Sequence, residues 1–206
     1  MSEPVDAQKV WEERYAESDR IWSGRPNVRL VEVVADLPPG RALDLGCGEG
    51  GDAVWLAQRG WQVVAADIAG NALQRAAAAA GDLGARIDFV QHDLTKTFPE
   101  GSFDLVSAQF LHSPLDWDRA VLMRRAAAAV APGGILLIVD HSAAPPWAQR
   151  MRDREFPSAQ AVVEGMNLDP SQWERMRTES VQREAESPDG QPVTLTDNVI
   201  VLRRVR

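Results

Sequence analysis

The sequence is poor in several residue types on which whole classes of protein depend. Cys47 is the only cysteine among 206 residues, so no internal disulfide and no cysteine-based metal cluster can form. The three histidines, His92, His112 and His141, show no short spacing of the kind that binds a metal, and the sequence predicts no metal site. The longest apolar run, at 135–140, is far too short to cross a bilayer.

Positive charge is also scarce. The chain has 22 lysines and arginines against 30 aspartates and glutamates, which gives a net charge of -8. A chain of this charge repels polyanions, so we expect no nucleic-acid partner. The opening residues lack the basic start and apolar core of a secretion signal, and we expect a cytoplasmic protein with no membrane partner. The oligomeric state stays open.

Composition is uniform along the chain, which predicts a single domain over 1–206. Apolar residues at loosely helical spacing predict an amphipathic helix over 5–17. A second helix is expected to follow, with Asn27 as its N-cap. We expect these two helices to form an N-terminal helical cap over 1–36.

Short apolar runs alternate with helical stretches through the middle of the chain. This alternation predicts a doubly wound α/β architecture, in which a mostly parallel sheet has right-handed crossovers and helices on both faces. The expected strands, separated by helices, cover 41–45, 61–67, 86–93, 103–110 and 134–140. The expected helices cover 51–59, 70–80 and 117–130.

The alternation stops beyond the fifth strand. Segment 141–170 is interrupted by prolines and has a short helix near 158–166, and it can lie over the strand ends, where open sheets bind ligands. The tail over 171–206 predicts a hairpin with its turn at Asp189-Gly190.

The loop after the first strand fits two glycine patterns at once. Gly46, Gly48 and Gly51 match the G-x-G-x-x-G of a dinucleotide site. With Gly50 in place of Gly51, the same loop reads G-x-G-x-G. Both kinds of site need a carboxylate at the end of the second strand, and Asp67 fits either. Spacing alone therefore leaves the ligand open.

Two carboxylates beside this loop, Asp44 and Glu49, favour a cationic ligand. Each carboxylate about 4 Å from a pyrophosphate oxygen would cost on the order of 4 kcal/mol at an effective dielectric of about 20. A ligand that carries a sulfonium and an ammonium group is instead stabilised by the same residues, and glycine allows it close to the backbone. Glu49 is the weaker indicator, because a water-facing loop position also explains it.

Several motifs in order extend this argument to a known family. Together they resemble the class I S-adenosylmethionine-dependent methyltransferases: Asp44-x-Gly46-x-Gly48-x-Gly50, Asp67, "HDL" at 92–94, "FDLV" at 103–106 and "APGGILLI" at 131–138. The stretch "WEERYAESDRIWSGRPN" at 11–27 is similar to small bacterial methyltransferases of the tellurite-resistance and thiopurine-methyltransferase-like group. The core resemblance covers 41–140. It implies a Rossmann-like methyltransferase fold with a seven-stranded sheet whose last strand runs antiparallel.

The resemblance also implies S-adenosylmethionine as cofactor and assigns residues to it. Asp44 would reach the amino group of the methionine moiety, and Asp67 would accept both ribose hydroxyls. Ile68 would pack against the adenine, whose edge would meet the Asp93 carboxylate and the Leu94 amide.

Further expected contacts border the methionine and ribose, lie near the transferable methyl at the end of the fourth strand, or close over the ligand with an aromatic face. These residues are Gly46, Cys47, Gly48, Gly50, Gln109, Phe110, Tyr15 and Trp22. Cys47 is expected to act as a small packing residue beside the ligand and not as a nucleophile.

Two histidines lie where a methyl acceptor should bind. His112 follows the fourth strand and His141 ends the fifth, and either could take a proton from an attacking hydroxyl, amine or thiol. Segment 141–170 would then be a lid over the acceptor site. The leading hypothesis is in-line methyl transfer to a small-molecule acceptor, which yields S-adenosylhomocysteine. A thiolate or an anionic metalloid acceptor would need no base.

Two alternatives belong to other functional classes. A nicotinamide-dependent reductase could use a similar sheet, but the only tyrosine, Tyr15, precedes the glycine loop and has no lysine four residues later. A regulator that binds the cofactor without transferring its methyl group is compatible with the sequence. The identity of the acceptor is also open.

Overall fold

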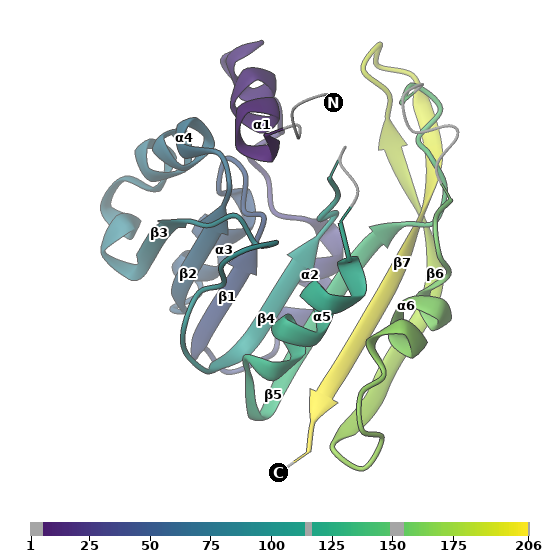
Figure 1. Ribbon diagram of the computed structural model, residues 1–206. Coiled ribbons are helices and arrows are strands. Elements are labelled where there is room, and N and C mark those ends of the chain that lie inside the picture. Colours follow the sequence, from purple (N-terminus) through teal and green to yellow (C-terminus); the bar gives the residue numbers. More distant parts are fainter. Residues whose placement is uncertain (1–5, 114–116, 149–154, 206) are drawn as a thin grey trace, which may run out of the picture.

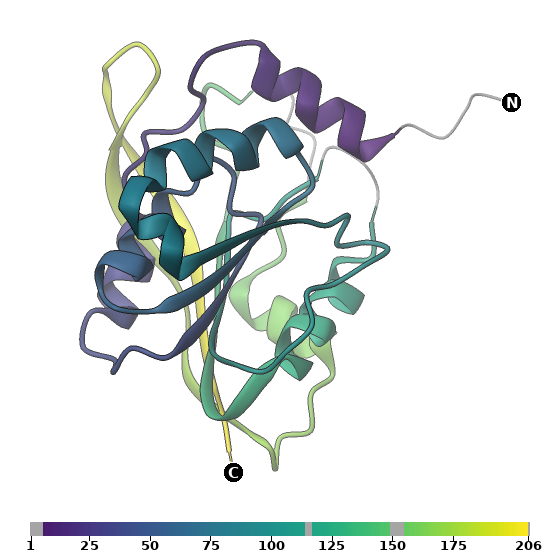
Figure 2. The same cartoon turned by 90° about the vertical axis from the view of Figure 1, so that its left-hand side faces the viewer.

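One seven-stranded sheet with helices on both faces makes up the fold (Figure 1, Figure 2). The structure is a computed structural model that describes residues 6–113, 117–148 and 155–205. The strands are β1 Arg41–Leu45, β2 Gln62–Asp67, β3 Ile87–Gln91, β4 Phe103–Gln109, β5 Val130–His141, β6 Trp173–Glu186 and β7 Pro192–Arg204. The helices are α1 Ala7–Ala16, α2 Val28–Val34, α3 Gly51–Gln58, α4 Gly70–Ala80, the 3-10 helix η1 Gly81–Arg86, α5 Arg119–Ala128 and α6 Ala159–Met166.

The strand order is β3-β2-β1-β4-β5-β7-β6. Strands β1 to β5 pair in parallel, whereas β7 pairs antiparallel with both β5 and β6. The predicted doubly wound sheet, its antiparallel last strand and the C-terminal hairpin are therefore confirmed. The chain builds outward from β1 to β3 and then returns to place β4 on the other side of β1. Open sheets bind ligands at such a switch point, at the carboxyl ends of the strands.

Alternating side chains of the strands build two cores, one on each face of the sheet. Leu43 and Leu45 of β1 belong to the core that α5 and α6 cover. Ala42 of the same strand belongs to the opposite core, which α2 and α3 cover. The central strands are buried on both faces, which explains why their sequences are continuous apolar runs and not alternating ones.

The helices and strands differ from the expected ones in several places. Strand β3 ends at Gln91, so His92 and Asp93 lie in the turn after it. Strand β5 begins at Val130, several residues before the expected start. Residues 92–102 are all described and contain no helix, so the expectation that helices separate all five strands is wrong for β3 and β4. The 3-10 helix η1 was not expected at all.

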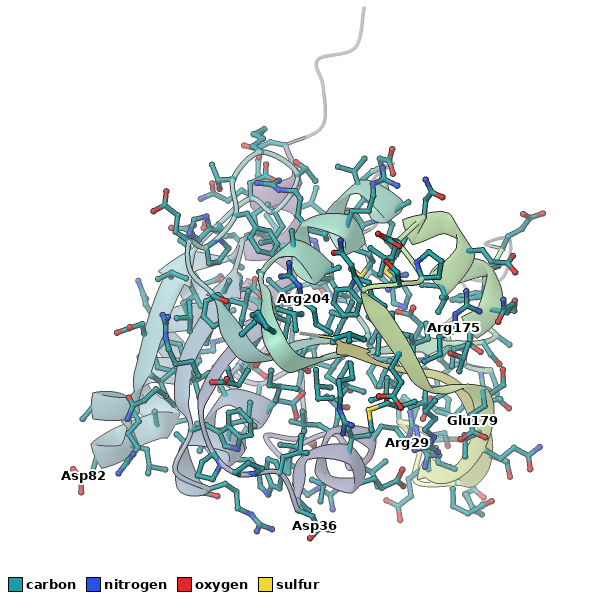
Figure 3. All side chains as sticks on the ribbon, turned by 90° about the horizontal axis from the view of Figure 1, so that it is seen from below. Arg29, Asp36, Asp82, Arg175, Glu179 and Arg204 are labelled. Atoms are coloured by element: carbon teal, nitrogen blue, oxygen red, sulfur yellow. The ribbon has the colours of Figure 1, made fainter. Side chains whose placement is uncertain are left out.

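The expected N-terminal cap divides into two parts. Helix α1 begins after Asp6, whose carboxylate accepts from the Gln8 amide at 3.0 Å, and it packs on α4 above the sheet (Figure 1). Helix α2 instead joins the core, and Arg29 on it reaches β6, where it donates to the Gln182 carbonyl at 2.9 Å (Figure 3). Residue 5 of the expected first helix and residues 149–154 of the expected lid lie outside the described residues.

Candidate active site

The glycine loop turns the chain sharply from β1 into α3. The Gly46 and Cys47 amides both donate to the Ala66 carbonyl on β2, at 2.8 and 3.0 Å. Gly46, Gly48 and Gly50 all have left-handed φ values, of +72°, +53° and +82°. Such φ values strain any residue with a Cβ. The backbone therefore follows the G-x-G-x-G pattern. The sequence alone could not distinguish this pattern from G-x-G-x-x-G.

Asp44 lies beneath this loop without a partner for one of its oxygens. The residue is 2% exposed, and Oδ2 accepts no hydrogen bond from the residues that the structure describes. Burial raises the pKa of this carboxyl well above its usual value, and the nearby carboxylates of Asp52 and Asp67 raise it further. A buried, charged carboxylate destabilises the folded protein unless a cation or a hydrogen-bond donor reaches it. The position fits an ammonium group, as expected for the methionine end of the cofactor.

Asp67 ends β2 and connects the second strand to the glycine loop. Its Oδ2 accepts from the Gly48 amide at 2.9 Å, and its Oδ1 accepts from the Ala69 amide at 2.9 Å. Burial raises the pKa of Asp67, and these two hydrogen bonds act in the opposite direction. Each carboxylate oxygen has a second lone pair. Asp67 can therefore hold the loop and still accept from a pair of hydroxyls.

Asp93 and Leu94 lie in the turn after β3. The His92 amide donates to the Asp67 carbonyl at 2.9 Å, which brings this turn against the end of β2. Partial burial disfavours the charged form of Asp93, but hydrogen bonds from Lys96 and Thr95 outweigh it and lower the pKa. The Leu94 side chain is buried in the core. Both Asp93 oxygens already accept from Lys96 or Thr95, so a ligand here would meet the remaining acceptor capacity of this carboxylate and the Leu94 amide.

The end of β4 carries a second strained position. Phe110 has a φ of +50°, which is rare for a residue with a bulky side chain. This turn brings the Phe110 ring within 4.5 Å, centroid to centroid, of the His141 ring on β5. Beside it, Gln109 donates to the Ser107 hydroxyl at 3.0 Å, and its buried Oε1 accepts nothing from the described residues. An unpartnered carbonyl and an aromatic ring therefore meet where β4 and β5 end.

Tyr15 and Trp22 touch the glycine loop from the N-terminal side. The Trp22 indole donates to the Tyr15 hydroxyl at 3.1 Å. A Cβ placed on Gly48 would lie 2.9 Å from that hydroxyl and 3.2 Å from the indole nitrogen. Burial raises the pKa of Tyr15, and the Asp67 charge adds to the effect, so the hydroxyl stays protonated. The structure thus brings both aromatic residues to the loop, as expected.

Glu49 is neither water-facing nor directed at a ligand. Its side chain is only 4% exposed and binds Arg75 together with the backbone of the N-terminal segment. The use of Glu49 as an indicator of a cationic ligand was therefore wrong. The argument from charge holds for Asp44 alone.

A cavity of about 150 Å³ opens at the ends of β4 and β5. The His112 and His141 rings stack with 5.6 Å between their centroids, and Phe156 meets both rings edge-on at 6.2 and 6.4 Å. Burial lowers the pKa of His141, Asp197 opposes this shift, and Arg183 adds to it. His141 is therefore a neutral imidazole near pH 7 and can accept a proton. The described residues that line the cavity are His112, Trp117, Arg119, Asp140, His141, Glu155, Phe156 and Pro157.

Sequence reasoning missed an ion pair in this cavity. Arg119 at the start of α5 donates to Asp140 Oδ1 at 2.5 Å, and His112 Nε2 lies 3.9 Å from the same oxygen. Burial raises the pKa of Asp140, and Arg119 opposes the shift. One signal was present in the sequence, because Asp140 nears the end of its strand just as Asp44 and Asp67 do.

Replacing Gly48 with alanine should disturb the loop and the two aromatic residues together. The new Cβ would meet both a strained φ and the Tyr15 hydroxyl, so we expect a loss of about 1–2 kcal/mol in the free energy of unfolding. Gly165 on α6 is the matched control, because a Cβ there meets nothing within 4 Å. Alanine at Gly165 should stabilise the protein by about 0.5–1 kcal/mol. Urea unfolding of both variants measures the difference, and equal effects would contradict the strain at Gly48.

Two classes of site are absent from the part of the chain that the structure describes. It contains no helix long and apolar enough to cross a membrane. Among the same residues, no group of three His, Cys, Asp or Glu side chains is placed to hold a metal ion.

Part of the chain matches a known domain family. Residues 42–134 match the family model for a methyltransferase domain. Thiocyanate methyltransferase 1 of Brassica oleracea is 31% identical over 150 residues, which are 68% of this chain and 65% of that protein. The 2-heptyl-1-hydroxyquinolin-4(1H)-one methyltransferase of Mycobacteroides abscessus is 32% identical over 132 residues, which are 61% of this chain and 58% of that protein. The chain thus spans less than two thirds of the length of these relatives.

A solved structure agrees on the fold. The N-methyltransferase NodS from Bradyrhizobium japonicum, in complex with S-adenosyl-l-homocysteine, superposes with a TM-score of 0.69. It is 19% identical in sequence, and the superposition covers 98% of this chain and 100% of that one. Residues 42–134 thus match a methyltransferase domain, and the fold agrees with that of a methyltransferase solved with S-adenosyl-l-homocysteine.

Proposed function

We propose that the protein transfers the methyl group of S-adenosylmethionine to a small aromatic acceptor that carries a hydroxyl group. The unpartnered, buried carboxylate of Asp44 beneath the glycine loop is the observation that carries the cofactor part of this proposal. Asp44 would hold the ammonium of the methionine moiety and Asp67 the ribose hydroxyls. Asp93 and the Leu94 amide would meet the adenine edge, and Ile68 its face. The acceptor would enter the cavity at the ends of β4 and β5.

Methyl transfer requires little of the protein beyond aligning the acceptor with the methyl group of the cofactor. The cofactor supplies a methyl group on a good leaving group, the sulfonium sulfur. Transfer would place the methyl group on the acceptor oxygen in exchange for the carbon–sulfur bond, and the acceptor would have to give up its proton. The neutral imidazole of His141 can take that proton. Gln109 and Phe110 would position the two reactants, and most of the acceleration comes from this alignment.

The cavity walls favour an aromatic acceptor over a small anion. Four aromatic side chains line the space and can stack on a planar ligand: His112, Trp117, His141 and Phe156. Carboxylates of Asp140 and Glu155 line it as well, and Asp140 already pairs with the Arg119 guanidinium. A cavity of about 150 Å³ can hold a single benzene-sized ring. An acceptor of one ring therefore fits better than an anion such as the thiocyanate that one relative is named for.

The same cavity argues against a regulator that binds the cofactor without transferring its methyl group, because a regulator needs no space for an acceptor. The narrower resemblance to the tellurite-resistance and thiopurine-methyltransferase-like group rests on 11–27 and is kept as part of the proposal. Metalloid and thiol acceptors therefore belong in any acceptor screen.

Binding experiments test the cofactor first. S-adenosylhomocysteine should raise the melting temperature of the protein and NAD should not, because only a ligand of the folded state adds stability. Stabilisation by NAD alone would exclude the methyltransferase proposal. A screen with a labelled methyl donor against phenols, amines, thiols, thiocyanate and metalloid oxyanions then identifies the acceptor, and phenols are the class expected to accept the label.

Replacing His141 with glutamine should lower turnover of a phenolic acceptor by about 10²–10⁴-fold and leave S-adenosylhomocysteine binding unchanged. The pKa of His141 is lowered, so the base form persists below its usual titration range, and wild-type turnover should fall only at more acidic pH. Glutamine at His112 measures how much that residue contributes to turnover. Glutamine at His92 is the control, because His92 bonds Thr97 in the turn after β3, away from the cavity. Undiminished turnover in both cavity variants would show that no histidine base takes part.

A further inference from the structure

Residues 15–27 cross the glycine loop: Tyr15 and Ala16 end α1, and residues 17–27 have no regular structure of their own. The side-chain hydrogen bonds within the segment run from Ser18 to the Arg20 carbonyl, from the Arg25 amide to Ser23 and from the Trp22 indole to the Tyr15 hydroxyl, and none of them reaches the loop. Its position over the loop must therefore be fixed by other parts of the chain. We call residues 15–27 the crossing segment.

Glu49 provides the central attachment. Its Oε2 accepts from the Ile21 and Trp22 amides at 3.1 and 2.9 Å, and its Oε1 accepts from Arg75 Nη1 at 3.0 Å. Arg75, on α4, also donates through Nη2 to the Tyr15 carbonyl at 2.7 Å. The ion pair between the buried Glu49 and the partly exposed Arg75 thus binds the backbone of the crossing segment at three places. Charged hydrogen bonds of this kind are stronger than neutral ones.

A second carboxylate fixes the far end of the segment. Asp52, in the first turn of α3, accepts from the Asn27 amide at 2.6 Å and from the Asn27 side chain at 2.7 Å. This bond explains why Asn27 occupies the N-cap position of α2 without making a capping hydrogen bond. Between the two attachments, the Arg25 carbonyl lies 2.9 Å from where a Cβ on Gly51 would be. The glycine loop and the crossing segment are therefore fitted to each other along their length.

We propose that Glu49 is a positioning residue for cofactor binding, because its ion pair with Arg75 holds Tyr15 and Trp22 against Gly48 as one wall of the cofactor site. This inference rests on the proposed function. The cofactor can then enter or leave only when the crossing segment moves away from the loop. The strength of the attachment through Glu49 sets both the affinity for the cofactor and the rate of product release.

Replacing Glu49 with glutamine tests the attachment. The variant keeps the size of the side chain but loses the charge and part of its capacity to accept. We expect the dissociation constant for S-adenosylhomocysteine, measured by calorimetry, to rise about ten- to hundredfold, mainly through faster dissociation. Trypsin should cut the Arg20–Ile21 bond faster by a similar factor, because the Ile21 amide is no longer held. In the wild type, S-adenosylhomocysteine should slow this cleavage.

Glu13→Gln is the matched control, since Glu13 lies on α1 with an exposed side chain paired only to Lys9 among the described residues. It should change neither binding nor cleavage. Arg75→Met gives a second variant in case Glu49→Gln folds poorly, and it removes both donors from a partly exposed side chain. The variant that combines Glu49→Gln with Arg75→Met should bind S-adenosylhomocysteine no more weakly than the weaker-binding single variant. Both changes break the same ion pair, so their effects should not add.

Three results would overturn the proposal. Unchanged binding by the Glu49 variant with faster cleavage would mean that the crossing segment is no part of the cofactor site. Tighter binding would mean that the segment obstructs the site. Unchanged cleavage would mean that Glu49 does not hold it. If the wild type itself fails to bind S-adenosylhomocysteine, the proposed function falls, and cleavage at Arg20–Ile21 still reports separately whether Glu49 holds the segment.

Discussion

Asparagine in place of Asp44 is expected to make the free protein more stable and the cofactor complex much weaker. The carboxylate is buried and one oxygen lacks a partner among the described residues, so its charge destabilises the free protein. Removing that charge should raise the free energy of unfolding by about 1–3 kcal/mol at neutral pH. The loss of the partner for an ammonium should weaken S-adenosylhomocysteine binding by about 2–5 kcal/mol, which is at least about thirtyfold.

The pH dependence gives this prediction a second readout. The pKa of Asp44 in the folded protein is raised, so its contribution to stability is most favourable in acid and is lost as the pH rises through that value. The free energy of unfolding of the Asp44→Asn variant should therefore exceed that of the wild type by most at high pH and by least in acid. Asp88→Asn, an exposed position on β3, is the control and should change neither quantity. A variant that loses both stability and binding would show that Asp44 acts as a structural residue.

Replacing Arg119 with methionine should be the most destabilising single change in the cavity. Arg119 is the cation that hydrogen-bonds to Asp140, and without it a buried carboxylate is left uncompensated. We expect a loss of about 3–5 kcal/mol in the free energy of unfolding at neutral pH. Burial raises the pKa of Asp140, so the loss should shrink in acid, where the carboxyl is protonated in both variant and wild type.

Two further variants separate the ion pair from the rest of the helix. Combining Arg119→Met with Asp140→Asn should recover most of the lost stability, because no charge is then left buried. Arg124→Met lies on the same helix and removes only an exposed bond to the Gly165 carbonyl, so its effect should be small. Urea unfolding at pH 5 and pH 8 measures all four proteins. A double variant as unstable as Arg119→Met alone would disprove the pairing.

The sequence was informative wherever a single local rule decides the outcome. Apolar runs predicted the strands because these are buried on both faces, and aspartates at strand ends pointed to the edge at which Asp44 and Asp67 meet. The glycines alone could not decide between two registers. The choice became clear only from backbone angles, which place Gly50 and not Gly51 in the left-handed region.

The failures at the candidate site involve contacts between distant parts of the chain. Glu49 was misread because its partners, Ile21 and Trp22, lie 28 and 27 residues away in sequence. Arg119 and Asp140 come from different elements and are joined only by the packing of α5 on the sheet. A pattern along the chain carries no information on such pairs, since charged residues near strand ends are also common on solvated loops.

The position of β7 constrains how the protein can fold. This strand follows β6 in the chain, yet it lies between β5 and β6 in the sheet. Strand β6 therefore has no partner until β7 has been inserted, and β5 remains an open edge for as long as that takes. Open edges of this kind are where partly folded chains pair with one another. The slowest and most aggregation-prone stage of folding should be the docking of the C-terminal hairpin, after the half of the sheet that holds the cofactor residues has formed.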